Sequence, residues 1–306
     1  MRGLRNAFST LQKQNAFRQR TSGSSNGGGS GYRFKRPQMH PLAKRVYIGL
    51  GGITVASGVF YYCSNLETVP VSGRLRFNDT SPEFVHRSGV EAYRQVLSEY
   101  TGAILPQNHH YTRLVRRVAH RILQHVNDKE AFKDLDVHVV DLPVRNAFVL
   151  PGGKIFVFTG ILSVAHNEDG LAAVVSHEMS HQIANHPAET IAKYRLLSFA
   201  QLLLVSIFPD LRYFFSRSFL DLVFLKPNSR YECSWLINRK METEADKIGV
   251  LLMHKAGYRI EEAVNMWRRM SAAGDAQPME FVSTHPAHET RIRDLLLLVK
   301  ELRRTE

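Results

Sequence analysis

Residues 177–181 read His-Glu-Met-Ser-His. On a helix, His177 and His181 project from the same face one turn apart, so their imidazoles can bind a single zinc ion. Glu178 lies between them and is positioned to act on a zinc-bound water. This stretch therefore predicts a helix that carries a zinc site.

The residues around this motif also favour a helix. Asp169 can cap its start. The face opposite the histidines is apolar and consists of Ala172, Val175, Met179 and Ile183. This face can be buried while the histidines face a cleft. The alternative is an ordinary helix with two surface histidines, because a short motif also occurs by chance. A third metal ligand would decide between these two interpretations.

Two common kinds of zinc site are excluded. The chain has only two cysteines, so any metal must be held by histidines and carboxylates. The metzincin pattern needs a histidine six residues after His181, but that residue is Pro187, and His186 is out of register by one position. The third ligand therefore has to come from another part of the chain.

A carboxylate ligand is available in the sequence Glu-Thr-Glu-Ala-Asp at residues 242–246. In a helix, Glu242 and Asp246 lie on one face. We expect Glu242 to bind the metal and Asp246 to orient a ligand histidine through its free ring nitrogen. Glu244 points elsewhere on the same helix and is a weaker candidate. The alternative is a solvated acidic face.

Two histidines and one glutamate leave a fourth position open, which is typical of a catalytic zinc. We therefore expect one Zn²⁺ per chain, with Glu178 taking up a proton as hydroxide forms. Attack on a peptide carbonyl creates an oxyanion that needs a further hydrogen-bond donor. His285 can supply it from the loop before a helix expected at Glu289–Glu301, and His288 is a nearby alternative.

The remaining periodicities predict a mostly helical α+β domain with a small sheet. Helices are expected at residues 90–100, at residues 111–126 and over most of the chain after Asp169. Strands are expected at residues 136–141, 146–150 and 154–158, the last two joined by the hairpin turn Pro151-Gly152-Gly153.

The first 45 residues carry ten Lys and Arg side chains and no acidic one, which leaves only +2 of the net charge of +12 for the rest of the chain. A nucleic-acid-binding domain would carry its charge on the folded part, so we expect no nucleic-acid partner. Arg-rich, acid-free composition is typical of a mitochondrial transit peptide. We interpret residues 1–45 as a transit peptide with a flexible basic linker; the alternative is an ordinary disordered tail.

Residues 46–63 contain no charged side chain. About 18 such residues, at ~1.5 Å rise each, come close to spanning a hydrocarbon core of ~30 Å. The preceding Lys44-Arg45 favours a transmembrane helix over a buried core helix, with the basic side in the matrix. We therefore expect a single-pass inner-membrane protein, with a connector at residues 64–84 and a metallopeptidase domain at residues 85–306 in the intermembrane space.

A second apolar segment covers residues 196–225. It is interrupted by Pro209, Asp210, Arg212 and Arg217, which leave pieces too short to span a bilayer. We interpret it as helices that lie on the membrane or cover the cleft, with a re-entrant segment as the alternative.

Four motifs in combination resemble a known family. They are Asn-Ala-Phe…Pro-Gly-Gly at residues 146–153, the His-Glu-Met-Ser-His motif, Glu-Thr-Glu-Ala-Asp followed by a Gly-Tyr helix break, and Ser-Thr-His-Pro…Arg at residues 283–291. Together they resemble the HtpX-like membrane-associated zinc metallopeptidases, and most of all their OMA-type mitochondrial inner-membrane subgroup. The resemblance covers roughly residues 85–300 and implies a zincin-like (gluzincin) fold.

The resemblance also implies roles for single residues. His177, His181 and Glu242 would bind zinc, and Glu178 would be the catalytic base. His285 would assist the transition state, and Arg291 would be structural. The strand with Asn146 and Ala147 would lie beside the cleft, where an extended substrate can add to its edge.

The function implied is quality control of inner-membrane proteins and stress-responsive processing of a dynamin-like fusion GTPase. Partners would be inner-membrane protein substrates and membrane lipid, and self-association into a homo-oligomer is compatible with this role. Two alternatives stay open. One is a catalytically inactive inner-membrane scaffold or adaptor that keeps the peptidase fold. The other is a multi-span prenyl-protein protease of the same superfamily, which needs several membrane helices where we find one good span.

One departure from the family pattern concerns the segment before Glu242. The family has a Ser-Arg pair a few residues ahead of its glutamate motif, but here Ser229-Arg230 is followed by Tyr231–Arg239. That stretch looks like an insertion. It is the only feature that supports the inactive alternative, because it could displace the start of the Glu242 helix.

Overall fold

The computed structural model describes residues 40–69, 71–207, 235–272, 285 and 289–304. Most of the segment expected as transit peptide and linker therefore lies outside the described residues. The chain divides into two units, residues 1–57 and residues 58–306, and the second contains the sheets and most of the helices.

Helix α2 spans Pro41–Ser64, so the conformation expected for residues 46–63 is confirmed as helical. Within the described part of the chain, no helix is both long and apolar enough to cross a membrane. The expected transmembrane span is therefore not confirmed by the structure.

The central sheet has three strands in the order β3-β5-β4, with bounds Asp136–Val140, Lys154–Phe158 and Ala147–Leu150. β3 pairs parallel with β5, and β4 pairs antiparallel with β5 from Ala147 opposite Val157 to Leu150 opposite Lys154. The predicted hairpin is confirmed, because Gly152 and Gly153 take the positive φ values of 89° and 83° that its turn needs. β4 has β5 as its only neighbour among the described strands, so it forms an edge of the sheet.

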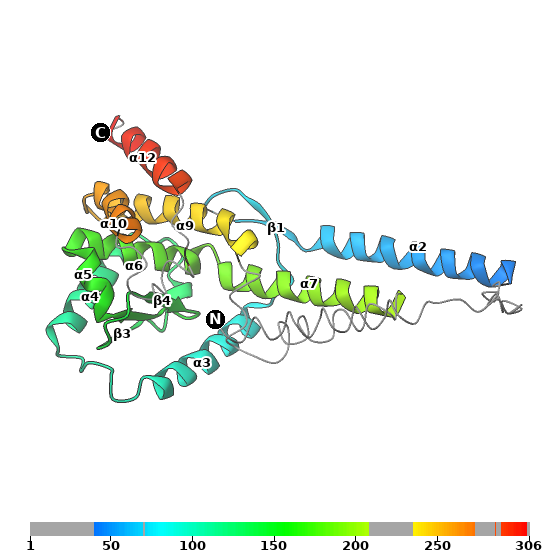
Figure 1. The fold of residues 1–306 in the computed structure, drawn as a ribbon, viewed down its shortest axis with the longest axis horizontal. Coiled ribbons are helices and arrows are strands. Elements are labelled where there is room, and N and C mark those ends of the chain that lie inside the picture. The colour runs from blue at the N-terminus through cyan, green and yellow to red at the C-terminus, as the bar shows by residue number, and fades with distance from the viewer. Residues whose placement is uncertain (1–39, 70, 208–234, 273–284, 286–288, 305–306) are drawn as a thin grey trace, which may run out of the picture. The chain divides into compact units, whose positions relative to one another are not determined.

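Helix α6 (Glu168–Ile183) packs against the sheet through β4 and against helices on its other sides (Figure 1). Those helices are α4 (His110–Leu123), α5 (Thr159–Ala165), α9 (Trp235–Lys255) and α10 (Glu261–Ala272). The remaining elements of this unit are α3 (Pro82–Glu99), the short 3₁₀ turn Glu130–Phe132, α7 (His186–Ile207) and α12 (Glu289–Arg304). The mostly helical α+β class predicted from the sequence is confirmed.

The surroundings of α6 differ from the prediction in two respects. The side chain that caps its start is Asn167, which accepts a hydrogen bond from the Gly170 N–H, and not Asp169. Asp169 instead pairs with Arg259 at 2.8 Å. The helix is also buried on nearly all sides, including its histidine face, rather than on one apolar face. This follows from its central place between the sheet and the surrounding helices.

The segment expected as a connector, residues 64–84, is folded. It forms the antiparallel hairpin of β1 (Leu66–Thr68) and β2 (Leu75–Phe77), followed by the first turn of α3. α3 starts at Pro82, earlier than residue 90, because Ser81 caps it by accepting from the Phe84 N–H. The boundary expected at residue 85 therefore cuts through a helix.

Two further segments are described only in part. Of the apolar segment 196–225, residues 196–207 belong to α7 and the rest lies outside the described residues. Of the expected insertion at Tyr231–Arg239, residues 235–239 form the start of α9, so this part is helical rather than looped. Residues 231–234 lie outside the described residues.

Candidate metal centre

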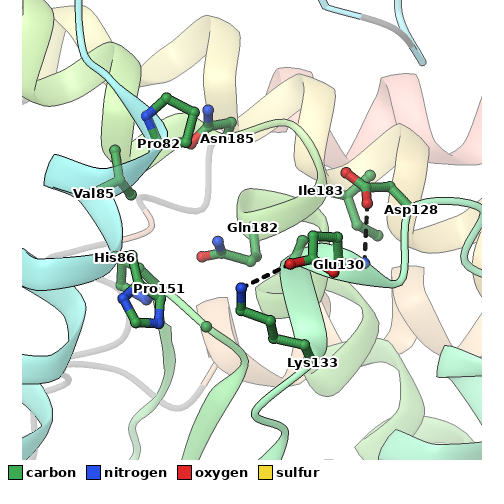
Figure 2. A pocket seen from close by; sticks show the side chains of 12 residues that line it. Pro82, Val85, His86, Asp128, Glu130, Lys133, Pro151, Gln182, Ile183 and Asn185 are labelled. Carbon is green, nitrogen blue, oxygen red and sulfur yellow. Dashed lines mark hydrogen bonds and ion pairs between the residues drawn. The ribbon is translucent and has the colours of Figure 1, made fainter.

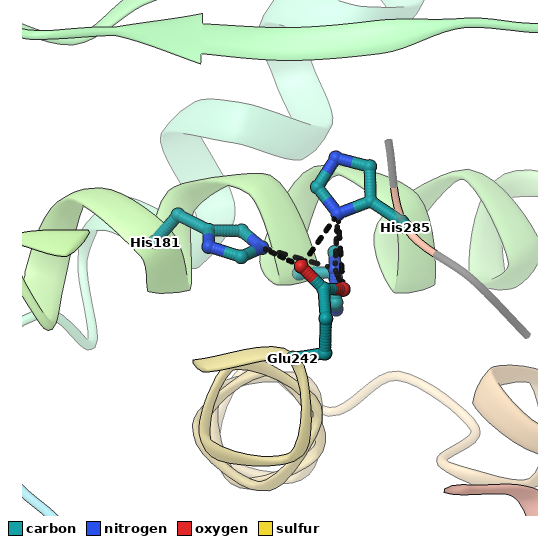
Figure 3. A group of neighbouring side chains, drawn as sticks. His181, Glu242 and His285 are labelled. Atoms are coloured by element: carbon teal, nitrogen blue, oxygen red, sulfur yellow. Dashed lines mark hydrogen bonds and ion pairs between the residues drawn. The ribbon is translucent and has the colours of Figure 1, made fainter. Parts of the chain in front are cut away.

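Four side chains from three segments of the chain converge on one point: His177 and His181 of α6, Glu242 of α9, and His285. Each offers one ligand atom, and these atoms all lie within 4.8 Å of one another. Figure 3 shows Glu242 reaching from α9 toward His181, while His285 approaches the same carboxylate. The structure thus brings together the three residues predicted as metal ligands and the histidine predicted to assist them.

The spacing of these atoms fits a tetrahedral metal. Ligand atoms about 2.1 Å from a zinc ion in that geometry lie ~3.4 Å from one another. His177 Nε2 lies 3.2 Å from His181 Nε2 and 3.3 Å from Glu242 Oε2. His181 Nε2 lies 3.6 Å from Glu242 Oε1. His285 Nδ1 borders the same point, at 3.4 Å from His177 Nε2 and 3.0 Å from Glu242 Oε2.

His177 is held through its second ring nitrogen. Its Nδ1 lies 3.0 Å from Asp246 Oδ1, and Asp246 accepts hydrogen bonds from Arg291 Nε at 2.7 Å and Nη2 at 2.8 Å. Burial alone would lower the pKa of His177, but the carboxylates of Asp246 and Glu242 outweigh it and raise that pKa to about 9. The contact expected from Asp246 is present because residues four apart on α9 share the face that meets α6.

Glu242 is a buried carboxylate with several partners. Burial would raise its pKa, but His285 and His181 beside it hold the pKa well below its ordinary value. Arg291 adds a contact from Nη1 to Glu242 Oε2 at 3.2 Å. Glu242 is therefore ionised at neutral pH, which an anionic metal ligand requires. Arg291 of α12 contacts the carboxylates of both Glu242 and Asp246, and its guanidinium lies 4.1 Å from the ring centre of Trp267.

Glu178 lies beside the cluster rather than within it. Its Oε1 is 3.5 Å from His285 Nε2 and has no hydrogen-bond partner among the described residues. Burial raises the pKa of Glu178 above its ordinary value. A buried carboxylate with an unused lone pair and a raised pKa can accept a proton near neutral pH.

His181 is supported differently from His177. Its Nδ1 lies 2.8 Å from His186 Nδ1, and His186 Nε2 lies 2.9 Å from Glu244 Oε2. Burial lowers the pKa of His181 well below its ordinary value and keeps the ring neutral, as a metal ligand must be. The sequence pattern did not predict this supporting role for His186 or Glu244, because helical spacing relates neither of them to His181.

Asn146 and Ala147 lie at the start of the edge strand β4, which packs on α6. The Asn146 carbonyl accepts a hydrogen bond from the Phe158 N–H at 3.0 Å, so this side of the strand is paired with β5. The other side of β4 faces no further strand among the described residues and can accept an extended peptide.

A cavity of about 310 Å³ opens where β4 ends. Its walls come from α3, the 3₁₀ turn, the β4–β5 turn at Pro151 and the end of α6. Figure 2 shows Gln182 between His86 and Glu130 in this cavity. Gln182 follows His181 directly in the chain, and its Oε1 has no hydrogen-bond partner among the described residues. None of the residues predicted to bind metal, act in catalysis or hold substrate lines this cavity.

Comparison with known proteins agrees with this geometry. The sequence profile of peptidase family M48 matches residues 111–298. The chain is 42% identical over 266 residues to the mitochondrial metalloendopeptidase OMA1 of Schizosaccharomyces pombe, covering 86% of this chain and 74% of that protein. It is 33% identical over 275 residues to the mitochondrial metalloendopeptidase OMA1 of Saccharomyces cerevisiae, covering 83% and 74%. It is 28% identical over 263 residues to the human mitochondrial metalloendopeptidase OMA1, covering 84% and 50%.

Proposed function

The chain belongs to peptidase family M48, and we propose that His177, His181 and Glu242 hold the zinc ion on which the peptidases of this family depend. The protein is a zinc-dependent metalloendopeptidase. The observation that carries the assignment of ligands is the tetrahedral spacing of their nitrogen and oxygen atoms. An inactive scaffold has no support, because the residues that a metallopeptidase needs are all present.

The chemistry divides between the metal and Glu178. A zinc ion at this position supplies Lewis acidity, since it polarises a peptide carbonyl and makes water acidic near neutral pH. Glu178 accepts the proton of the attacking water on its carboxylate. It then delivers that proton to the amine nitrogen that leaves as the peptide C–N bond breaks. Its raised pKa suits both transfers.

His285 is assigned to the oxyanion that forms when the carbonyl is attacked. Its Nδ1 lies beside His177 Nε2 and Glu242 Oε2, so its ring has to move aside for a substrate to enter. From the adjacent position a ring N–H can donate to the developing negative charge. Its 3.5 Å distance from Glu178 keeps it beside the reacting atoms.

The substrate is assigned to the edge of β4 that faces no further described strand, beginning at Asn146 and Ala147. An extended peptide that pairs there gains main-chain hydrogen bonds irrespective of its sequence, which suits an enzyme that cleaves many unfolded segments. The cavity beside Pro151 offers room for one substrate side chain at the end of the same strand.

The protein is mitochondrial, as its relatives are by name. Within the mitochondrion we assign it to the inner membrane, as a single-pass protein with its peptidase domain in the intermembrane space. The support is the uncharged run at residues 46–63 with Lys44-Arg45 before it. Its substrates are then inner-membrane proteins, cleaved in quality control and in stress-responsive processing, with membrane lipid and a second copy of the chain as further partners.

Activity is tested on the purified full chain with an unfolded membrane-protein substrate. Cleavage should occur with zinc, stop when a chelator removes the metal, and return when zinc is added back. A preparation that binds zinc and still leaves the substrate intact would instead support the scaffold.

Location is tested separately in isolated mitochondria. The protein should resist carbonate extraction, and its C-terminal domain should become accessible to added protease once the outer membrane is ruptured. Protection of that domain in mitoplasts would overturn the assigned topology without affecting the assigned chemistry.

A further inference from the structure

A line of buried polar side chains leads away from the outer nitrogen of His181. His186 Nδ1 lies 2.8 Å from His181 Nδ1, and His186 Nε2 lies 2.9 Å from Glu244 Oε2. Glu244 in turn accepts hydrogen bonds from Arg74 Nε at 3.0 Å and Arg74 Nη2 at 2.7 Å. His186 and Glu244 are only 3% and 4% exposed, so water cannot replace these contacts.

The positions of the protons along this line are determined by the cluster at its inner end. His181 turns Nε2 toward the ligand atoms of His177 and Glu242, so its proton must be on Nδ1. His186 Nδ1 can then only accept that proton in a hydrogen bond. The proton of a neutral His186 ring is consequently on Nε2, from which it donates to Glu244. One consistent placement of protons therefore links the Glu244 carboxylate through the His186 and His181 rings to the metal-facing Nε2 of His181.

The backbone between α6 and α7 makes this contact geometrically feasible. Residues five apart on a continuous helix are ~140° apart around its axis and ~7.5 Å apart along it, too far for a direct hydrogen bond. Here α6 ends at Ile183, and Asn185 takes a left-handed conformation with φ 52° before α7 begins at His186. Asparagine tolerates this conformation better than most residues. The resulting corner turns the His186 ring back toward His181.

The β1–β2 hairpin fixes the outer end of the line. Arg74 binds Glu189 of α7 at 2.9 Å and 2.6 Å as well as Glu244 of α9, and Ser72 donates a further hydrogen bond to Glu244. Arg76 donates to the carbonyl of Ala184 at the end of α6. A buried carboxylate is costly unless it is paired, so these contacts hold Glu244 ionised and in one place.

We propose that His186 and Glu244 are positioning residues of the metal centre, in which a carboxylate acts on the ligand His181 through an intervening imidazole. This inference rests on the proposed function, because it presupposes that His181 binds zinc. His177 obtains the same support directly from Asp246. His181 obtains it indirectly, through His186, from Glu244. Both carboxylates are on α9. The hairpin that follows α2 in the chain thereby becomes part of the support of the metal.

The test compares His186→Leu with His186→Asn in the full-length protein. Leucine fills the space and removes the acceptor, whereas the Asn side-chain oxygen can take the place of Nδ1. Zinc affinity is measured near neutral pH by competition with a chromophoric chelator. Losing such a support costs ~10–100-fold in metal affinity, so we expect that loss for His186→Leu and a smaller one for His186→Asn. In the cobalt-substituted proteins, the visible absorption bands of His186→Leu should shift, which a purely structural loss would not cause.

Glu244→Gln adds a second test, at the outer end of the line. Its zinc affinity should fall between those of the wild type and His186→Leu. The double variant should bind zinc no more weakly than His186→Leu alone, because Glu244 acts only through His186. Additive losses in the double variant would show that Glu244 acts by another route and would overturn the proposal.

The control for general destabilisation is Ile122→Val, which truncates a fully buried core side chain of α4 that belongs neither to the metal cluster nor to the line of side chains. It should lower the thermal midpoint and leave zinc affinity unchanged. Wild-type affinity in His186→Leu would refute the positioning role while leaving the metal centre intact. A wild type that binds no zinc would refute the metal centre itself, and the positioning role with it.

Discussion

At the scale of single residues, the site holds an excess of negative charge that a dication would neutralise. Three carboxylates, those of Glu178, Glu242 and Asp246, are buried around the cluster, and Arg291 is the one guanidinium that faces them in the described part of the chain. With neutral histidines this leaves a charge of −2. The raised pKa of His177 has the same origin, because a protonated imidazole partly offsets that charge. Binding of Zn²⁺ has to displace this proton, so zinc affinity depends on pH.

The two glutamates of the site should respond differently to the same substitution. Glu178→Gln keeps the volume and removes the base, so zinc should stay near one per chain while proteolysis falls by at least ~100-fold. Glu242→Gln removes the anionic ligand, so zinc should be lost on dialysis and activity with it. Metal analysis of both purified variants provides the measurement. If Glu178→Gln loses zinc and Glu242→Gln keeps it, the roles of base and ligand are wrongly assigned.

His285→Ala separates stabilisation of the oxyanion from metal binding. The variant should keep zinc, because three ligands remain, and kcat should fall by ~100-fold or more, as on removal of one oxyanion donor. KM should change little. A large loss of zinc with a proportional loss of activity would instead make His285 an essential metal ligand.

Glu244 should contribute to the pH dependence of folding. Burial would raise its pKa, but His186 and Arg74 outweigh burial and lower that pKa from 4.5 to about 2. Because the folded protein holds Glu244 ionised where the unfolded chain binds a proton, the stabilisation is complete above pH 4.5 and is lost as the pH falls toward about 2. Glu244→Gln should therefore lose about 3 kcal/mol at neutral pH and much less in acid. Denaturant unfolding with a chelator present measures this, and a pH-independent difference would contradict it.

At the scale of elements, the site depends on the close packing of α6 and α9. Gly249 of α9 sits where a Cβ atom would come within 3.2 Å of the His177 backbone nitrogen and 3.3 Å of Ser176 Oγ. Glu242 and Asp246 are both on α9, so the distance between the axes of α6 and α9 sets the distance from Glu242 to the histidines. A glycine here allows the helices to approach closely enough for both carboxylates to reach α6.

This dependence also explains what the sequence could reveal. Spacing within one helix predicted His177 with His181 and Glu242 with Asp246, because residues four apart share a face whatever surrounds them. The supporting role of His186 was not predictable, since it depends on the left-handed backbone at Asn185 and on Arg74 from a hairpin taken for a connector. The prediction of Asp169 as the cap of α6 was wrong because Asn167, which also can cap a helix, lies only two residues earlier. Helix boundaries are the least reliable part of a prediction from sequence patterns.

Gly249→Leu should separate the two helices. Overpacking at such a contact lowers the free energy of unfolding by about 1–3 kcal/mol. Because Glu242 moves with α9, zinc affinity should fall as well, although no ligand is changed. The matched control is Gly102→Leu, at a glycine with positive φ and open space around it. This variant should destabilise the protein through backbone strain and leave zinc affinity unchanged. Unchanged zinc affinity in Gly249→Leu would show that the helix separation does not control the ligand geometry.

At the scale of the whole molecule, the cluster connects segments that are far apart in the sequence. The side chains of the cluster come from positions 177, 181, 242 and 285, and two stretches between them, residues 208–234 and 273–284, lie outside the described residues. Bringing these positions together closes two long loops, which costs conformational entropy on folding. A metal bound at their meeting point acts as a cross-link that exists only in the folded chain. Its binding energy therefore adds to the stability of the entire domain.

Removal of zinc should consequently lower the thermal midpoint of the whole domain. At a free zinc concentration of about 100 times Kd, binding to the folded state alone adds ~2.7 kcal/mol. For a domain of this size each kcal/mol shifts the midpoint by about 2–4 °C, so chelation should lower it by about 5–10 °C. Glu178→Gln should show the same shift, because it retains the metal. Glu242→Gln should start at the lower midpoint and respond little to a chelator, because it has already lost the ligand. Calorimetry of the three proteins with and without chelator makes the comparison, and equal shifts in wild type and Glu242→Gln would place the metal outside this cluster.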